Sequence, residues 1–242
     1  MRLLFIPGFM QPGDAWSPVA QRLPERYPSA LLDHREHTFQ GRLREIAELG
    51  EGAAIVGYSL GGRLALHAAL DEPGRYTALV TVGASAGIDS PAMRAARAQA
   101  DERLASWMET APIEEIVAIW ERQPLFADQS DALLDAQRPG RLAQDPRSLA
   151  SLLRTAGQGS LEPVWPLLGR LDLPLLALAG ALDDRYSRSA QRLASEAPRA
   201  RAGIVEGAGH AAHLQQPDAV ARLLVEFLDQ HLGEGGLGDL HA

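Results

Sequence analysis

The feature that most constrains the fold of this chain is a serine flanked by glycines, in the stretch Gly57-Tyr58-Ser59-Leu60-Gly61. This G-x-S-x-G pattern follows an apolar run, residues 53–56, that predicts a buried strand, and precedes a segment, residues 60–70, with helical apolar spacing. A serine on so sharp a turn has a strained backbone, and the glycines remove Cβ atoms that would collide there. The pattern therefore predicts a hydroxyl exposed at the carboxyl edge of a sheet, beside a helix N-terminus that favours a developing anion. The alternative is an ordinary Gly-Ser turn of an α/β protein.

The rest of the chain alternates short apolar segments with helical ones, which predicts a parallel sheet of about six strands covered by helices on both faces. We expect strands over residues 3–6, 30–32, 53–57, 78–82, 173–180 and 202–205. We expect the main helices of this α/β fold over residues 16–23, 42–49, 59–70, 187–196 and 218–231.

The strand signal is interrupted between residues 93 and 157, where only helical stretches occur, over residues 93–108, 113–121, 130–136 and 149–155. An all-helical insertion between two strands of a parallel sheet predicts a cap over the active site. We therefore expect a core of residues 1–90 and 158–233, a helical cap of residues 91–157, and a flexible, glycine-rich tail of residues 234–242.

Composition narrows the classes of partner. With 242 residues, 46% of them hydrophobic, the chain is long enough for one well-buried core. It has no cysteine, so no disulfide or thiolate site is available. The net charge of −8 disfavours nucleic acid or an anionic membrane as partner, and no run of about 18 apolar residues predicts a membrane span. We expect a cytoplasmic protein that acts on a small molecule without cofactor or metal; its oligomeric state is left open.

Nucleophilic catalysis by the serine needs a base within reach and an acid to orient that base. In doubly wound hydrolase-type chains these follow the serine in the order Asp, then His, each after a strand. Asp183 follows the strand expected over residues 173–180, and His210 follows the one expected over residues 202–205. Either residue alone would be an ordinary loop residue. Together they predict a triad of Ser59, Asp183 and His210, with Asp184 as the alternative acid.

Two other loops expected at this edge of the sheet indicate a function less specifically. The Phe9 N–H, after the first strand, is placed to stabilise an oxyanion, with a plain strand-to-helix turn as the alternative. His34, Arg35 and His37 follow the second strand without a metal-binding or catalytic spacing. We interpret them as a solvated loop, with contact to substrate as the alternative.

These residues resemble the α/β-hydrolase fold and, more narrowly, the MenH family of menaquinone biosynthesis, the 2-succinyl-6-hydroxy-2,4-cyclohexadiene-1-carboxylate synthases. The narrower resemblance rests mainly on motifs in the expected cap, because caps differ among hydrolase-fold families. The motifs are Gly57-Tyr58-Ser59-Leu60-Gly61-Gly62-Arg63, Arg94-x-x-Arg97-x-x-x-Asp101, Trp120-x-x-Gln123-Pro124-Leu125-Phe126, Arg141-Leu142-Ala143 and Gly209-His210-x-x-His213. The chain departs from the family at Pro7-Gly8, where His-Gly is usual, and at residues 33–37, which replace a glycine-rich loop.

The resemblance implies a lyase that releases pyruvate from a polycarboxylate cyclohexene by proton abstraction, without an acyl-enzyme. It implies that Ser59 is the base, that His210 polarises it, that Asp183 holds His210, and that Phe9 and Leu60 supply oxyanion N–H groups. Tyr58, Arg63, Arg97, Trp120 and Arg141 would bind the substrate, since arginine forks suit carboxylates. Trp120 could instead be a core residue of the cap, and the three arginines could be surface cations. Two other functions stay open: a carboxylic-ester or carbon–carbon-bond hydrolase with Ser59 as covalent nucleophile, and a ligand-binding protein without activity.

Overall fold

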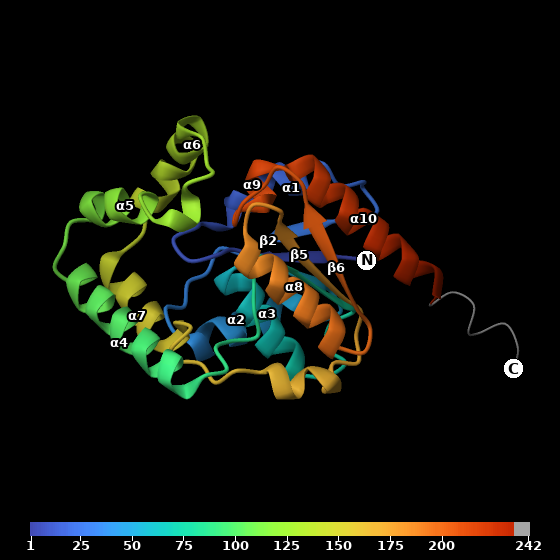
Figure 1. Ribbon diagram of the computed structural model, residues 1–242. Coiled ribbons are helices and arrows are strands. Elements are labelled where there is room, and N and C mark those ends of the chain that lie inside the picture. The colour runs from blue at the N-terminus through green and yellow to red at the C-terminus, as the bar shows by residue number, and fades with distance from the viewer. Residues whose placement is uncertain (235–242) are drawn as a thin grey trace, which may run out of the picture.

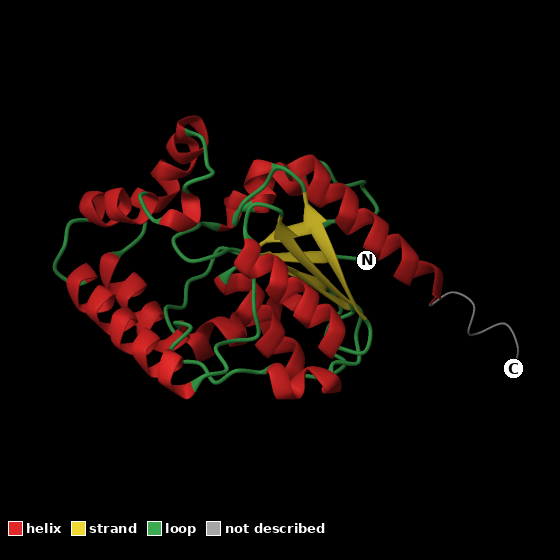
Figure 2. Cartoon of the chain, viewed as in Figure 1, coloured by secondary structure: helices red, strands yellow, loops and turns green. Residues whose placement is uncertain are grey.

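Six parallel strands form one sheet in the order β2-β1-β3-β4-β5-β6 in a computed structural model that describes residues 1–234 (Figure 2). The predicted parallel sheet of about six strands is confirmed. The strands are β1 (Leu3–Ile6), β2 (Ser29–Leu31), β3 (Ala54–Tyr58), β4 (Ala78–Val82), β5 (Leu175–Gly180) and β6 (Ala200–Val205).

Side chains alternate between the two faces of this sheet, and both faces are buried. Leu4 and Ile6 of β1 belong to one hydrophobic cluster, whereas Leu3 and Phe5 belong to the other. The first cluster includes residues of α2 (Phe39–Gly50), α3 (Leu60–Asp71) and α8 (Asp184–Glu196). The second includes residues of η1 (Gly13–Trp16), α1 (Ser17–Ala20), α9 (Ala212–Gln215) and α10 (Pro217–Glu234). Figure 1 shows the two groups of helices on opposite sides of the sheet.

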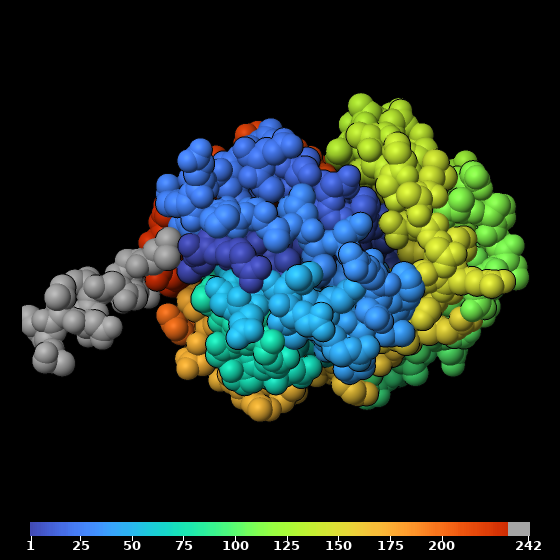
Figure 3. All heavy atoms as spheres, turned by 180° about the vertical axis from the view of Figure 1, so that it is seen from behind, coloured from blue at the N-terminus to red at the C-terminus, as the bar shows by residue number. Residues whose placement is uncertain are grey.

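Between β4 and β5 the chain forms a helical insertion that lies beside the sheet, in green and yellow in Figure 1. Its small hydrophobic cluster includes Met108, Ile116 and Leu149 together with Met10 from the loop after β1. Figure 3 shows the same segment against the N-terminal part of the chain. The insertion contains α4 (Pro91–Met108), α5 (Ile113–Glu121), η2 (Pro124–Phe126), α6 (Asp131–Leu142) and α7 (Pro146–Ala156).

The two ends of the insertion are hydrogen-bonded to each other. Val164 N donates to Ala86 O at 2.7 Å, and Trp165, the first residue of η3 (Trp165–Arg170), donates from its indole to Gly87 O at 2.9 Å. The chain therefore leaves the core and returns to it at one place.

Two expected helices differ most from the prediction, and α2, α7 and α8 each begin three residues before the expected position. Residues 16–23 form a 3₁₀ turn and a single α-turn, because Arg22 and Leu23 donate to carbonyls only three residues back, and Pro24 follows. Helix α6 continues past Ala136 to Leu142 and contains Pro139. The tail expected over residues 234–242 lies outside the described residues, apart from Glu234 at the end of α10. No helix within residues 1–234 has the length and apolar character to cross a membrane.

Candidate active site

Ser59 lies on the turn between β3 and α3 with a backbone that few residues other than glycine adopt, at φ 50° and ψ −108°. The turn is possible because two glycines let the backbone approach itself. A Cβ on Gly57 would lie 2.3 Å from Gly61 O, and a Cβ on Gly61 would lie 2.3 Å from Ile6 O. The strain and the glycines together hold the Ser59 hydroxyl at the N-terminus of α3.

A chain of hydrogen bonds joins Ser59 to the two residues that the sequence pairs with it. His210 Nε2 lies 3.0 Å from Ser59 Oγ, and His210 Nδ1 lies 2.8 Å from Asp183 Oδ2. Asp183 also caps α8, because its Oδ1 accepts from Tyr186 N at 3.2 Å. Asp184, the alternative acid, is exposed as the first residue of α8. Such an arrangement can take a proton from the serine hydroxyl and hold it on the imidazole.

The loops that carry Asp183 and His210 are packed backbone to backbone. A Cβ on Gly180, at the end of β5, would lie 2.1 Å from Gly209 O. This close approach sets the positions of His210 and Asp183 relative to each other.

The expected oxyanion amides are those of Phe9 and Leu60. Phe9 and Leu60 both line the cavity in front of the serine, and neither backbone N–H has a hydrogen-bond partner among the described residues. Both amides are therefore free to donate to a ligand.

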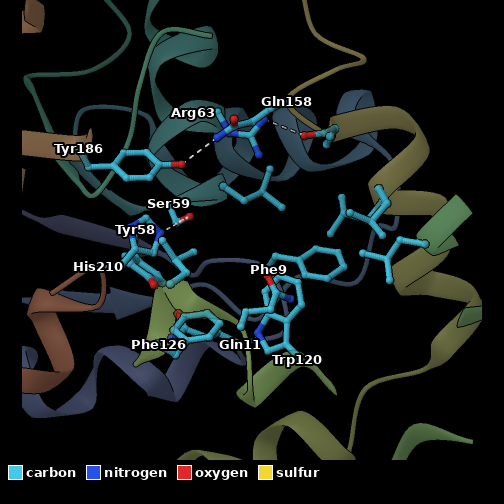
Figure 4. A pocket seen from close by; sticks show the side chains of 18 of the residues that line it. Phe9, Gln11, Tyr58, Ser59, Arg63, Trp120, Phe126, Gln158, Tyr186 and His210 are labelled. Carbon is cyan, nitrogen blue, oxygen red and sulfur yellow. Dashed lines mark hydrogen bonds between the residues drawn. The ribbon is translucent and has the colours of Figure 1, made fainter. Parts of the chain in front are cut away.

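A cavity of about 280 Å³ opens in front of Ser59, between the sheet edge and the insertion (Figure 4). Its wall contains every substrate-binding residue that the resemblance implies, whereas Asp183 lies behind His210. The predicted residues in the wall are Phe9, Tyr58, Ser59, Leu60, Arg63, Arg97, Trp120, Arg141 and His210.

Arg63 is a cation without an acidic partner in this wall. Its guanidinium donates to Ala156 O at 3.0 Å, and no ion pair to it is found among the described residues. Burial lowers the pKa of Arg63 to about 10, which leaves it charged at neutral pH. Arg63 is partly buried, and an unpaired charge that loses hydration in this way is stabilised when an anion meets it.

The other two arginines are paired within the insertion. Arg97, whose side chain is 40% exposed, donates to Asp101 at 2.7 Å. Arg141 is buried and donates to Glu121 and Gln137, both at 2.8 Å, while its Nε has no partner in the structure. Their charges are therefore balanced before any ligand binds.

Aromatic residues of the cavity wall pack against each other and also line the cavity. Trp120 contacts Phe9 and Phe126, with ring centroids 5.1 and 5.7 Å apart, and it also lines the cavity. Burial raises the pKa of Tyr58 well above its usual range, and its ring lies 4.2 Å from that of His213. His213 is fully buried without a hydrogen-bond partner for either ring nitrogen, and burial lowers its pKa to about 3. Tyr58 and His213 are therefore both uncharged at neutral pH.

The sequence reasoning missed several residues of the site, among them a hydrogen-bonded group of three. Gln158 donates to the Tyr186 hydroxyl at 2.8 Å and accepts from Arg185 at 3.1 Å, and the Tyr186 ring lies 4.5 Å from that of His210. Arg185 and Tyr186 could have been found, because they open a helix directly after Asp183. Gln158 follows the insertion without any local signal.

The prediction of a solvated loop over residues 33–37 is wrong for His34. Its side chain is 2% exposed and lies 2.6 Å from the Glu45 carboxylate, which also accepts from the N–H groups of Arg35 and Glu36. Glu45 faces the loop from α2 and draws the imidazole inward. Arg35 and His37 are exposed, and none of the loop residues lines the cavity.

No group of three or more acidic or histidine side chains in residues 1–234 is placed to hold a metal ion.

Comparison with known proteins gives one family and several close relatives. Residues 3–223 match the alpha/beta hydrolase family. The chain is 31% identical over 245 residues to the 2-succinyl-6-hydroxy-2,4-cyclohexadiene-1-carboxylate synthase of Serratia proteamaculans, covering 93% of this chain and 92% of that one. It is 28% identical over 240 residues to the enzyme of the same name from Enterobacter sp. strain 638, covering 93% and 91% of the two chains. The structure of MenH from S. aureus superposes with a TM-score of 0.89 at 24% identity, covering 96% of this chain and 94% of that one.

Proposed function

Because the chain belongs to the alpha/beta hydrolase family, and within it resembles the synthases named above, we propose that it is a lyase of menaquinone biosynthesis. It eliminates pyruvate from a polycarboxylate cyclohexene intermediate and leaves 2-succinyl-6-hydroxy-2,4-cyclohexadiene-1-carboxylate. The helical insertion, residues 91–157, acts as the cap that closes over the substrate.

Ser59 is the base in this proposal. Its hydroxyl takes a proton from a substrate carbon while His210 Nε2, 3.0 Å away, accepts the proton that the hydroxyl held. The electron pair left on carbon breaks the bond to the pyruvyl group, which leaves as its enolate and takes up a proton to become pyruvate, so no bond forms between Ser59 and the substrate. Asp183 holds the imidazole in the required tautomer through its 2.8 Å hydrogen bond. The free N–H groups of Phe9 and Leu60 stabilise the negative charge that develops on the substrate.

The observation that carries the proposal is the unpaired Arg63 guanidinium in the cavity wall. A neutral ester would leave this partly buried charge unpaired, whereas a substrate carboxylate would balance it with charge-assisted hydrogen bonds. Arg97 and the free Nε of Arg141 supply further donors for a ligand with several carboxylates.

The second candidate is a carboxylic-ester or carbon–carbon-bond hydrolase, which the hydrogen-bonded Ser59, His210 and Asp183 support equally well. Ser59 would then form an acyl-enzyme that water cleaves. A protein that only binds a ligand has no use for the strained backbone at Ser59, so we place it third.

The experiment that separates these functions supplies the synthase substrate and follows pyruvate release, with a neutral nitrophenyl ester in parallel. The lyase releases pyruvate, and mass spectrometry of rapidly quenched enzyme finds no adduct on Ser59. A substrate-derived adduct would contradict the base mechanism, and ester hydrolysis without pyruvate would favour the hydrolase.

We predict that Ser59→Ala lowers kcat by at least about 10³-fold while the protein still folds. Alanine removes only the hydroxyl that faces His210, and it is no more strained than serine at this backbone position. Thermal unfolding followed by circular dichroism serves as the control. A turnover rate unchanged from wild type would exclude both catalytic functions.

A further inference from the structure

A second cavity of about 560 Å³ lies next to the one in front of Ser59, and we call it the outer groove. One of its walls is α8, which presents Arg185, Arg188 and Arg192. These residues are three and four positions apart, so they share one face of the helix. The loop before α4 and the first turns of α4 form the opposite wall, with Asp89 as the only acid that lines the groove among the described residues.

The arginines of the outer groove are not equivalent. Arg192 is fixed as part of the wall, because it pairs with Asp89 and Glu196 and its guanidinium lies 3.8 Å from the centroid of the Trp165 ring. Arg188 is exposed and has neither an ion pair nor a hydrogen bond from its side chain within the described part of the chain. Arg185 is also exposed, and its side-chain hydrogen bond goes to the neutral Gln158. Two guanidinium groups therefore face this groove without acidic partners.

The outer groove adjoins the catalytic cavity through residues that line both. Arg97 and Arg185 belong to both walls. Arg188 in the groove, Arg185 in the shared wall and Arg63 beside Ser59 thus form a series of cations without acidic partners that leads from the surface to the serine.

We propose that the outer groove captures the carboxylate substrate and passes it to the catalytic cavity, with Arg188 and Arg185 as the residues that bind it first. This inference rests on the proposed function for the identity of the substrate. The chain as a whole has a net charge of −8, so a polycarboxylate is repelled from most of the surface. A basic groove beside the cavity concentrates such a substrate where it is needed, and it does so through long-range attraction that salt screens.

The first test measures binding without turnover, using citrate as a tricarboxylate probe. The background is Arg63→Ala, which removes the unpaired cation of the inner cavity, and calorimetry at low ionic strength follows citrate binding. Adding Arg188→Glu should weaken citrate binding at least about tenfold, because it reverses a charge in the groove. Adding Arg44→Glu, an equal charge change at an exposed position on α2, should change it less than about twofold. Equal affinities of the two double variants would overturn the proposal.

The second test measures capture during catalysis. In an otherwise wild-type enzyme, Arg188→Glu should lower kcat/KM for pyruvate release by about tenfold at low salt with kcat preserved, and the loss should shrink toward about 0.5 M salt. An equal loss in kcat would assign Arg188 to the chemical step and overturn the capture role. If the wild-type enzyme releases no pyruvate, the proposed function fails, whereas the citrate titration still decides whether the groove binds polycarboxylates.

Discussion

At Arg63 a guanidinium lies in the cavity wall with a backbone carbonyl as its hydrogen-bond acceptor. Replacing it by alanine should cost about 2–5 kcal/mol of transition-state stabilisation on a polycarboxylate, the range for truncating one partner of a buried charge pair. Lysine should restore little, because a point charge does not reproduce the planar fork. The measurement is kcat/KM for pyruvate release and for a neutral ester, with Arg44→Ala as the matched surface control. Equal small losses on both substrates would show that Arg63 does not bind a carboxylate.

Sequence order predicted which residues meet at Ser59, because the carboxyl ends of neighbouring parallel strands share one edge of a sheet. It could not predict how each arginine is paired. Arg141 is balanced by Glu121, 20 positions away on α5, and Arg63 has only a neutral acceptor, 93 positions away. These differences depend on helix packing within the insertion, which leaves no local trace in the sequence.

At the scale of elements, the two loops that hold Asp183 and His210 depend on the missing side chain of Gly180. Gly180→Ala should push the His210 loop away from β5, lower kcat, and reduce the free energy of unfolding by about 1–3 kcal/mol, as overpacking does. Gly169→Ala is the control, since a Cβ there would meet no atom within 4 Å. Activity assays and urea unfolding of both variants are the measurements. A Gly180→Ala enzyme as active as the Gly169→Ala enzyme would mean that the loops adjust without cost.

Periodicity predicted most elements but not all of their ends. Helix α5 has the predicted bounds, because its apolar residues mark one face clearly. Helix α6 extends past the predicted end through Pro139, a residue that normally ends a helix. Arg138 and Arg141, on either side of Pro139 and Gly140, both donate to Glu121 of α5, whose side chain is 8% exposed. These tertiary contacts support a final turn that local propensity disfavours.

At the scale of the whole molecule, buried histidines predict acid sensitivity. Burial lowers the pKa of His67 to about 4 and that of His213 to about 3, from an ordinary value of 6.5. At a pH between the lowered pKa of each histidine and 6.5, the unfolded chain binds a proton that the folded protein does not. The free energy of unfolding therefore falls as the pH falls below about 6.5. Each histidine contributes up to about 1.4 kcal/mol per pH unit.

His213→Phe should remove one of these contributions and make the dependence of stability on pH less steep between about pH 4 and 6.5. Both ring nitrogens of His213 lack partners, so the substitution breaks no hydrogen bond. Urea unfolding at several pH values measures the slope, and His37→Asn, at an exposed position, is the control. A slope equal to that of the wild type would mean that His213 becomes protonated in the folded state.

The paired ends of the helical insertion have a consequence for how such a protein can change. Because Ala86 and Gly87 are hydrogen-bonded to Val164 and Trp165, the two ends of the stretch that contains the insertion lie side by side. Helices can be lengthened, lost or exchanged there without altering the register of β4 and β5, which pair directly beneath. Selectivity for a substrate and the integrity of the sheet are thus separable traits, and new specificities can evolve, or be grafted, through one contiguous segment of the gene.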